Sequence, residues 1–157
     1  MFSGCICYAY VMILFGPHDV LGGWLCEKIG YVPTVHFRCI GNVNEEGEIK
    51  GVVGFDGWNG ASCQMHVAGE GNWVNRELIR CVFDYAFNTA EMKVLIGAVP
   101  SGNKRAIHFD KRMGFKEVAR IKDAHPDGEL IILSMRRDEC RFLEKEKDGK
   151  QSNSRAA

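Results

Sequence analysis

A change in the spacing of apolar residues in the middle of the chain most constrains its fold. Ala61–Val67 is predicted to be a strand, whereas apolar residues from Leu78 to Phe87 recur at the spacing of one helix face. Val94–Val99 is then continuously apolar, which is typical of a strand covered on both faces. A strand, a crossover helix and a second such strand form a right-handed parallel unit. The sequence therefore predicts an α/β protein.

Further elements are expected on both sides of this unit. Asp19 is expected to cap a helix that stops at Gly30, and another helix is expected to end at Gly114. Both helices would pack on a single sheet that also contains the remaining predicted strands, at residues 5–14, 35–43, 49–55, 115–121 and 129–135. The fold class is thus a mixed antiparallel and parallel sheet with helices on both faces.

Length, charge and cysteine usage exclude several classes of protein. The 157 residues suffice for one domain, expected at 1–143, and residues 144–157 read as a disordered tail. Twenty basic residues balance twenty acidic ones, so neither a nucleic acid nor a membrane surface is an expected partner. The seven cysteines show no Cys-x-x-Cys pair, which predicts reduced thiols, no metal site and a cytoplasmic location. The apolar residues 1–15 are too short for a membrane span and lack a signal-peptide cleavage site.

A glycine-rich turn lies between the Ala61–Val67 strand and the following helix. Gly69 and Gly71 precede Asn72, which is a plausible helix cap. The free N–H groups at a helix start suit a phosphate, so the turn is a candidate anion site. The same residues are also compatible with a plain tight turn.

A second motif completes the pattern. Asn103-x-x-Ala106 is followed by Gly114-Phe115 and a final hairpin. In this order the chain resembles the GCN5-related N-acetyltransferase superfamily, particularly its short bacterial and phage-type members. The resemblance covers about residues 19–143 and implies direct transfer of an acetyl group from acetyl-CoA to an amine.

The resemblance also implies a cofactor site. The fourth and fifth strands would splay apart, so that pantetheine lies between them like an added strand. Backbone groups of Val67 and Ala68 would hold the acetyl and pantetheine groups, Asn103 would bind the pantetheine amide, and Phe109 would lie nearby. The diphosphate would be bound by Gly69, Gly71, Asn72, Trp73, Val74, Asn75 and Arg76.

Two positions depart from the superfamily pattern. Asn72 and Trp73 stand where later glycines of the diphosphate loop are usual, so Trp73 must point away from the phosphates. Asp110 stands where many members have a tyrosine that protonates the leaving thiolate. Asp110 could replace it only if its pKa were strongly raised, and would otherwise be a solvated helix residue.

His66 is the candidate general base, because it lies near the end of the fourth strand and an unperturbed imidazole suits proton transfer at neutral pH. The alternative is a half-buried histidine bonded to the turn at 56–60. Glu70 is a weaker candidate base, since a carboxylate beside the diphosphate would be repelled. Cys63 is poorly placed to pair with His66, because residues three apart on a strand face opposite sides.

Three functions are consistent with these features. The first is an acetyl-CoA-dependent N-acetyltransferase, monomeric or homodimeric, with a protein amine as the preferred acceptor. The second is a non-catalytic module of the same fold that engages a host or partner protein. The third, a nucleotide enzyme using Gly69-Glu70-Gly71, lacks the Lys-Ser/Thr end of a P-loop and the third glycine of a dinucleotide turn.

Overall fold

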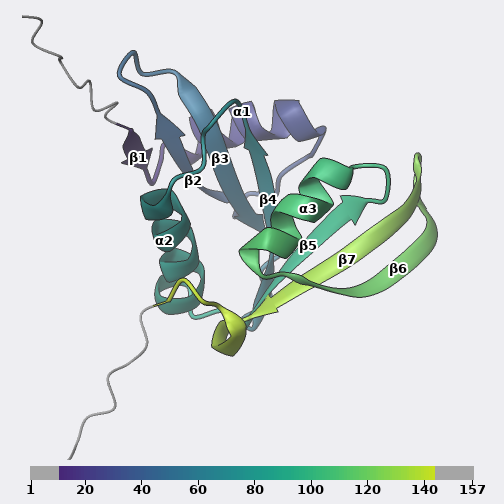
Figure 1. Cartoon of the computed structure of the whole chain (residues 1–157). Coiled ribbons are helices and arrows are strands. Elements are labelled where there is room, and N and C mark those ends of the chain that lie inside the picture. Colours follow the sequence, from purple (N-terminus) through teal and green to yellow (C-terminus); the bar gives the residue numbers. More distant parts are fainter. Residues whose placement is uncertain (1–10, 144–157) are drawn as a thin grey trace, which may run out of the picture.

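The computed structural model describes residues 11–143, which form one seven-stranded mixed sheet of order β1-β2-β3-β4-β5-β7-β6 (Figure 1). The strands are β1 Met12–Leu14, β2 Arg38–Val43, β3 Ile49–Asp56, β4 Ser62–Gly69, β5 Val94–Pro100, β6 Lys116–His125 and β7 Gly128–Arg136. The helices are α1 His18–Ile29, α2 Arg76–Asp84 and α3 Lys104–Met113. A π-helical turn, Tyr85–Thr89, extends α2, and a 3-10 turn, Arg137–Glu139, follows β7. The predicted mixed sheet with helices on both faces is confirmed.

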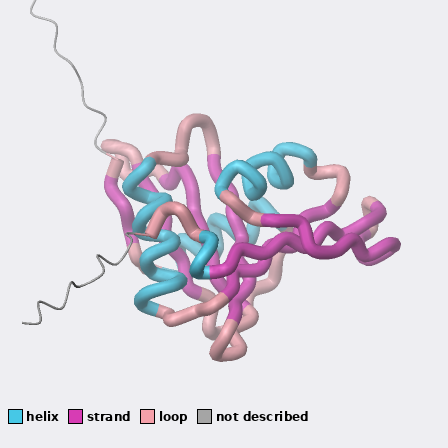
Figure 2. Tube along the Cα trace, turned by 60° about the horizontal axis from the view of Figure 1, so that its bottom comes forward, coloured by secondary structure: helices cyan, strands magenta, loops and turns pink. Residues whose placement is uncertain are grey.

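The helices divide between the two faces of the sheet (Figures 1 and 2). Helix α1 buries Leu21 and Leu25 against Cys39 and Val52 of β2 and β3. Helices α2 and α3 share one large cluster on the opposite face. The parallel β4–β5 pair, with α2 as its crossover, is the predicted central unit, and every other strand pair is antiparallel.

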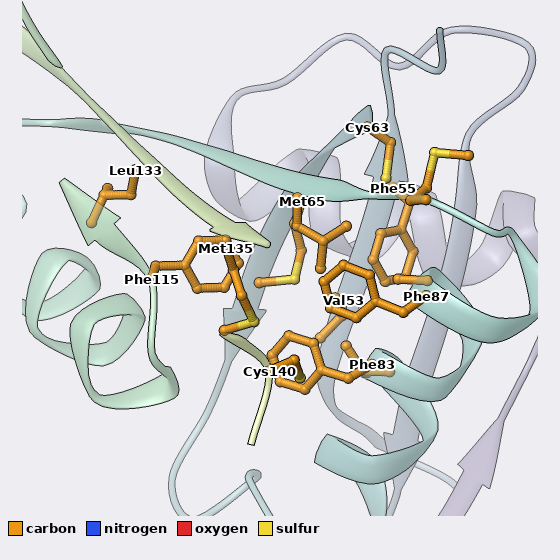
Figure 3. Packing of buried hydrophobic residues seen from close by; sticks show 14 of the residues in the cluster. Val53, Phe55, Cys63, Met65, Phe83, Phe87, Phe115, Leu133, Met135 and Cys140 are labelled. Carbon is orange, nitrogen blue, oxygen red and sulfur yellow. The ribbon is translucent and has the colours of Figure 1, made fainter. Parts of the chain in front are cut away.

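The larger core cluster joins the two halves of the sheet (Figure 3). Phe55 and Met65 come from the first half, Leu133 and Met135 from the last strand, and Phe83 from α2. The ring of Phe83 also stacks on that of Phe142, at 5.2 Å between ring centroids, so the segment after β7 is fixed against α2.

Helix ends show which local signals the sequence carries. Gly30 and Gly114 both adopt left-handed backbone, at φ 65° and 110°, and end α1 and α3 as predicted. Asn75, not Asn72, caps α2, because its side chain accepts from the Leu78 amide at 2.8 Å. Asp19 lies inside α1 rather than capping it; Pro17 precedes that helix and makes no side-chain cap.

Other boundaries differ in extent. The last hairpin is longer than expected, reaching His125 and Arg136, whereas β2 begins only at Arg38. The predicted first strand is present at 12–14, its earlier half lies outside the described residues, and so does the expected tail at 144–157. Within residues 11–143, no helix has the length and apolar character needed to span a membrane.

Candidate active site

The sheet opens between its two central parallel strands. β4 and β5 share three residue pairs, Ser62–Val94, Cys63–Leu95 and Gln64–Ile96, and no more. Beyond Gln64 and Ile96 each strand continues, β4 along β3 and β5 along β7, while the two diverge (Figure 1). The splay predicted for the fourth and fifth strands is therefore present.

The alternation of a strand decides which β4 backbone groups face this gap. The Ala61 carbonyl accepts from Lys93 and Val94, so it points toward β5, whereas the Glu70 amide donates to Lys50 in the β3 direction. Odd-numbered β4 residues therefore direct their peptide groups into the gap and even-numbered ones toward β3. Val67 is placed to bind a ligand in the gap. Ala68, expected to share this role, pairs with Val52 of β3 instead.

The start of α2 lies at the open end of the gap and offers unused donors. Gly71 adopts left-handed backbone, at φ 61°, and turns the chain from β4 toward the helix. Asn75 takes the Leu78 amide. Among the residues that the structure describes, no amide from Gly71 to Glu77 donates to another backbone or side-chain group. The partial positive charge of a helix start favours an anion at these amides.

Trp73 points away from these amides and into the protein. Its side chain is 8% exposed, and its ring lies over the paired glycines Gly51 and Gly69. A Cβ added at Gly51 or Gly69 would lie 2.0 or 2.2 Å from ring atoms of Trp73. Position 69 must therefore be glycine, because any side chain there would collide with the indole of Trp73. The sequence analysis did not predict this role. Asn42 fixes the same segment, because its side-chain amide donates to the Trp73 carbonyl.

Trp73 and Phe109 close one face of the gap. Their rings lie 5.8 Å apart between centroids, with Trp73 over β3 and β4 and Phe109 on α3. Together with Met65, Val67 and Met113 they surround a cavity of about 20 Å³, little more than one water-sized sphere. Phe109 thus lies beside the gap as expected, in contact with protein. Val74 lines the same cavity.

His66 lies on the opposite face, the one that carries α1. It pairs with Gly54 and lies 4.1 Å from Tyr31 and 6.1 Å from Phe37, between ring centroids. Its Nε2 atom is buried and has no hydrogen-bond partner among the described residues. Burial lowers the pKa of His66 from its usual 6.5, and the nearby Asp56 carboxylate opposes that shift. The imidazole is therefore neutral at pH 7 and able to accept a proton.

Asp56 does not bond His66; it holds the loop that covers it. The carboxylate is fully buried and accepts from the Tyr31 hydroxyl at 3.1 Å and from the backbone amides of Thr34 and Gly57, each at 2.9 Å. The Thr34 hydroxyl is a fourth donor. These bonds lower the pKa of Asp56 although burial alone would raise it. The alternative in which His66 bonds the turn at 56–60 is therefore wrong.

Asp110 is buried, at 8% exposed, so the expectation of a solvated helix residue is wrong. A Cβ added at Gly97 would lie 3.5 Å from its Oδ2 atom, which places the carboxylate over β5 one residue past the last β4–β5 pair. Burial raises the pKa of Asp110 to about 6. At pH 7 about a tenth of these side chains are protonated.

His66 and Asp110 consequently flank the gap from opposite faces. His66 follows Gln64 by two residues and faces α1, and Asp110 covers Gly97 on the face of α3. One group can take a proton from a molecule that enters on the α1 face. The other can give a proton on the α3 face, so the two do not compete.

The remaining candidates are placed as follows. Asn103 caps α3 through an oxygen that accepts from the Ala106 amide at 3.1 Å, which leaves its side-chain NH₂ group free to donate. Arg76 is exposed at the first position of α2. Glu70 is paired with Lys28 of α1 at 2.5 Å, which lowers its pKa and disfavours it as a base. Cys63 is fully buried on the face opposite His66, and burial raises the pKa of its thiol to about 12.

Sequence reasoning missed Asp56 as the anchor of the loop over His66, and Gly51 and Asn42 as supports of Trp73. Each is 22 or more residues away from a group it contacts, so no local spacing announces the contact. No cluster of three or more His, Cys, Asp or Glu side chains suited to a metal ion occurs in residues 11–143.

Comparison with known proteins supports this geometry at the level of fold. No family model matches the sequence, and no curated protein matches it either. Solved structures of spermidine N-acetyltransferase from Vibrio cholerae do match. The complex with CoA and spermine has a TM-score of 0.64 at 13% identity, covering 85% of this chain and 98% of that one.

Two further structures of that enzyme agree. A dodecameric structure in an intermediate state gives a TM-score of 0.63 at 12% identity, with 82% of this chain and 94% of that chain covered. A complex with manganese ions gives 0.64 at 13% identity, with 82% and 93% covered. The chain therefore has the fold of the GCN5-related N-acetyltransferases.

Proposed function

We propose that the protein transfers an acetyl group from acetyl-CoA directly to an amine. The observation that carries this proposal is the gap between β4 and β5, because an unpaired strand edge there leads to unused amides at the start of a helix. A thioester attached to a diphosphate requires such a pair of features. One binds an extended amide-containing chain, and the other binds phosphate oxygens.

The residues present fit the co-substrate in three places. Gap-facing groups of Val67 can bind pantetheine, the NH₂ group of Asn103 can donate to a pantetheine amide, and the amides from Gly71 to Arg76 can bind the diphosphate. Acetyl-CoA supplies the activated acyl group. The backbone donor at Val67 polarises the carbonyl, a contact that is worth about 3 kcal/mol in comparable sites.

Two side chains complete the proton transfers. The neutral His66 takes a proton from the attacking ammonium or from water bound to it, since its Nε2 atom has no partner in the part of the chain that the structure describes. Asp110 gives a proton to the departing thiolate on the opposite face. It is the residue whose surroundings raise its pKa to about 6, so a proton is available there at a slightly acidic pH.

The acceptor is an amine, carried either by a small molecule or by a protein. Spermine is bound in one structural neighbour, and a protein amine is the acceptor that the sequence favours. We propose that the protein acts in the cytoplasm, because its described cysteines are free thiols and a reducing compartment keeps them so. We further propose a monomer or a homodimer as the active species.

One observation favours a second function, a binding module that does not catalyse transfer. Trp73 and Phe109 already fill one face of the gap, and Asp110 stands where many members of the superfamily that the sequence resembles have a tyrosine. In that case the protein would bind CoA weakly or not at all, and its surface would contact a partner protein.

Calorimetry and a thiol-release assay separate these functions. We expect acetyl-CoA to bind at micromolar concentration and free CoA thiol to appear when an amine is added. Binding of CoA without thiol release from any amine would favour the binding module. Absence of both would refute the proposed enzyme.

A further inference from the structure

Within residues 11–143, no helix covers one face of the last three strands, β5, β6 and β7. Helix α3 covers β5 and β7 on one side, where Gly97 and Leu133 are buried. By alternation the neighbouring positions face the other side, and they are exposed or half-buried. We name this surface the open strand face; it consists of Ile96, Ala98, Ala119, Ile121, Leu130 and Ile132.

The open strand face continues directly from the candidate base. Gln64 and Ile96 are paired, so His66 and Ala98 stand at equivalent positions on either side of the gap and on the same face. Tyr31 forms an aromatic wall on the His66 side, at 4.1 Å between ring centroids. A molecule whose nitrogen reaches His66 from this side must lay its carbon frame against Tyr31 or against the open strand face.

The strand carboxylates near this surface point elsewhere. Glu117 pairs with Lys111 of α3 at 3.0 Å, which fixes it on the covered face. Arg120 pairs with Glu117 and Glu129, which fixes Glu129 on that face too. Asp56 is fully buried, and its oxygens already accept from four donors, so it presents no free carboxylate to this surface. Glu139 is likewise paired, with Lys116 at 2.6 Å, so none of these four carboxylates is free for a second or third ammonium group.

We propose that the acceptor is a primary amine with one positive charge and an apolar carbon frame, bound along the open strand face with its nitrogen at His66. This inference rests on the proposed function and narrows its substrate class. An apolar frame gains by leaving water, whereas an ammonium group desolvated without a partner is strongly disfavoured. A free alkyl or arylalkyl amine and the terminal amine of a peptide with apolar first residues share this chemistry.

The test compares three acceptors by thiol release at saturating acetyl-CoA: phenethylamine, a peptide beginning Leu-Phe, and spermidine. We expect kcat/KM for phenethylamine or the peptide to exceed that for spermidine by about 100-fold, because a desolvated polar group left without a hydrogen-bond partner weakens binding by that order. The ratio of kcat/KM for phenethylamine to that for the peptide shows whether the acceptor is a free small amine or the terminal amine of a peptide. A preference for spermidine would overturn the inference and leave the proposed function intact. Failure of every amine to release thiol would overturn both.

Two variants sharpen the test. Ala98 is exposed, so Ala98→Asp should fold and should place a carboxylate on the open strand face. We expect it to shift the selectivity toward spermidine by about tenfold, the value of one charged hydrogen bond. Thr89→Asp adds the same charge at an exposed site on the π-helical turn and should leave the selectivity unchanged. An unchanged selectivity in Ala98→Asp would overturn the inference.

Discussion

The two faces of the β4–β5 gap are built differently. On the α3 face, Trp73 and Phe109 stack over the strands around a cavity of about 20 Å³. On the α1 face, the buried Nε2 atom of His66 has no partner within residues 11–143, and no helix of that range covers the neighbouring strands β5 and β7. The α3 face is defined by the packing of side chains, and the α1 face by a buried polar atom without a hydrogen-bond partner among the described residues. Substitution of the packed rings on the α3 face should therefore cost stability, whereas substitution of His66 on the α1 face should cost activity.

Removing the indole should have the largest effect. Trp73→Ala leaves a cavity above Gly51 and Gly69 and should lower the free energy of unfolding by about 3–5 kcal/mol. Urea denaturation measures this value. Ile132→Ala on the open strand face is the matched control, with an expected loss of about 1 kcal/mol because that side chain is only half-buried. Equal losses in the two variants would show that the faces do not differ.

His66→Ala should affect the rate rather than the stability. We expect kcat to fall about 10²- to 10⁴-fold at saturating acceptor, as is typical when a general base is removed. In the wild type, burial holds the pKa of His66 below 6.5, so the rise of activity with pH should have its midpoint below 6.5, and deprotonation of Asp110 should lower activity above about pH 6. Measuring the release of CoA thiol over a range of pH gives both kcat and the midpoint of its pH dependence. If the same midpoint persists in His66→Ala, the rise of activity with pH is due to the titration of another group.

Asp110→Asn should stabilise the protein at high pH. The raised pKa of Asp110 means that its contribution to stability is full below the unfolded pKa of 3.8 and is lost as pH rises through about 6. The charged carboxylate therefore destabilises the fold at pH 8 by about 2–3 kcal/mol. Thermal unfolding of the two proteins should differ at pH 8 and converge near pH 4. Asp138→Asn, at an exposed site, is the control without such a difference.

Asn103→Asp should have the smallest effect. Aspartate caps a helix as well as asparagine does, so stability should change by less than about 0.5 kcal/mol. The substitution removes the NH₂ group that is free in the structure, and KM for acetyl-CoA should rise about fivefold to tenfold. An unchanged KM would restrict Asn103 to its role as a cap.

The same contrast between packing and chemistry explains what the sequence could predict. Period and turn residues identify the β4–α2–β5 unit, Gly30 and Gly114 as helix ends, and the order of the elements, because each depends on neighbours in the chain. The true α2 cap was missed, since two asparagines stand within one turn and local rules fit both. The role of Gly69 was also missed. It depends on the ring of Trp73, which lies over both Gly69 and its cross-strand partner Gly51.

The candidate site was only partly predictable for the same reason. The positions of His66, Val67 and Asn103 follow from their elements: His66 and Val67 lie on β4 beyond its last pair with β5, and Asn103 caps α3. The burial of Asp110 and the orientation of Ala68 toward β3 depend on tertiary packing and register. The clamp of Asp56 on the loop at 31–34 joins segments that no sequence pattern links.

Residue-resolved amide hydrogen exchange tests the central claim most directly, because it reports each peptide group along β4. In the free protein, the Val67 amide should exchange rapidly at the unpaired edge, whereas the Ala68 amide, which faces β3, should be protected. Saturating acetyl-CoA should slow exchange at Val67 and from Asn72 to Glu77 and leave Ala68 unchanged. Protection of Val67 before the addition, or no change at any of these amides after it, would contradict the account.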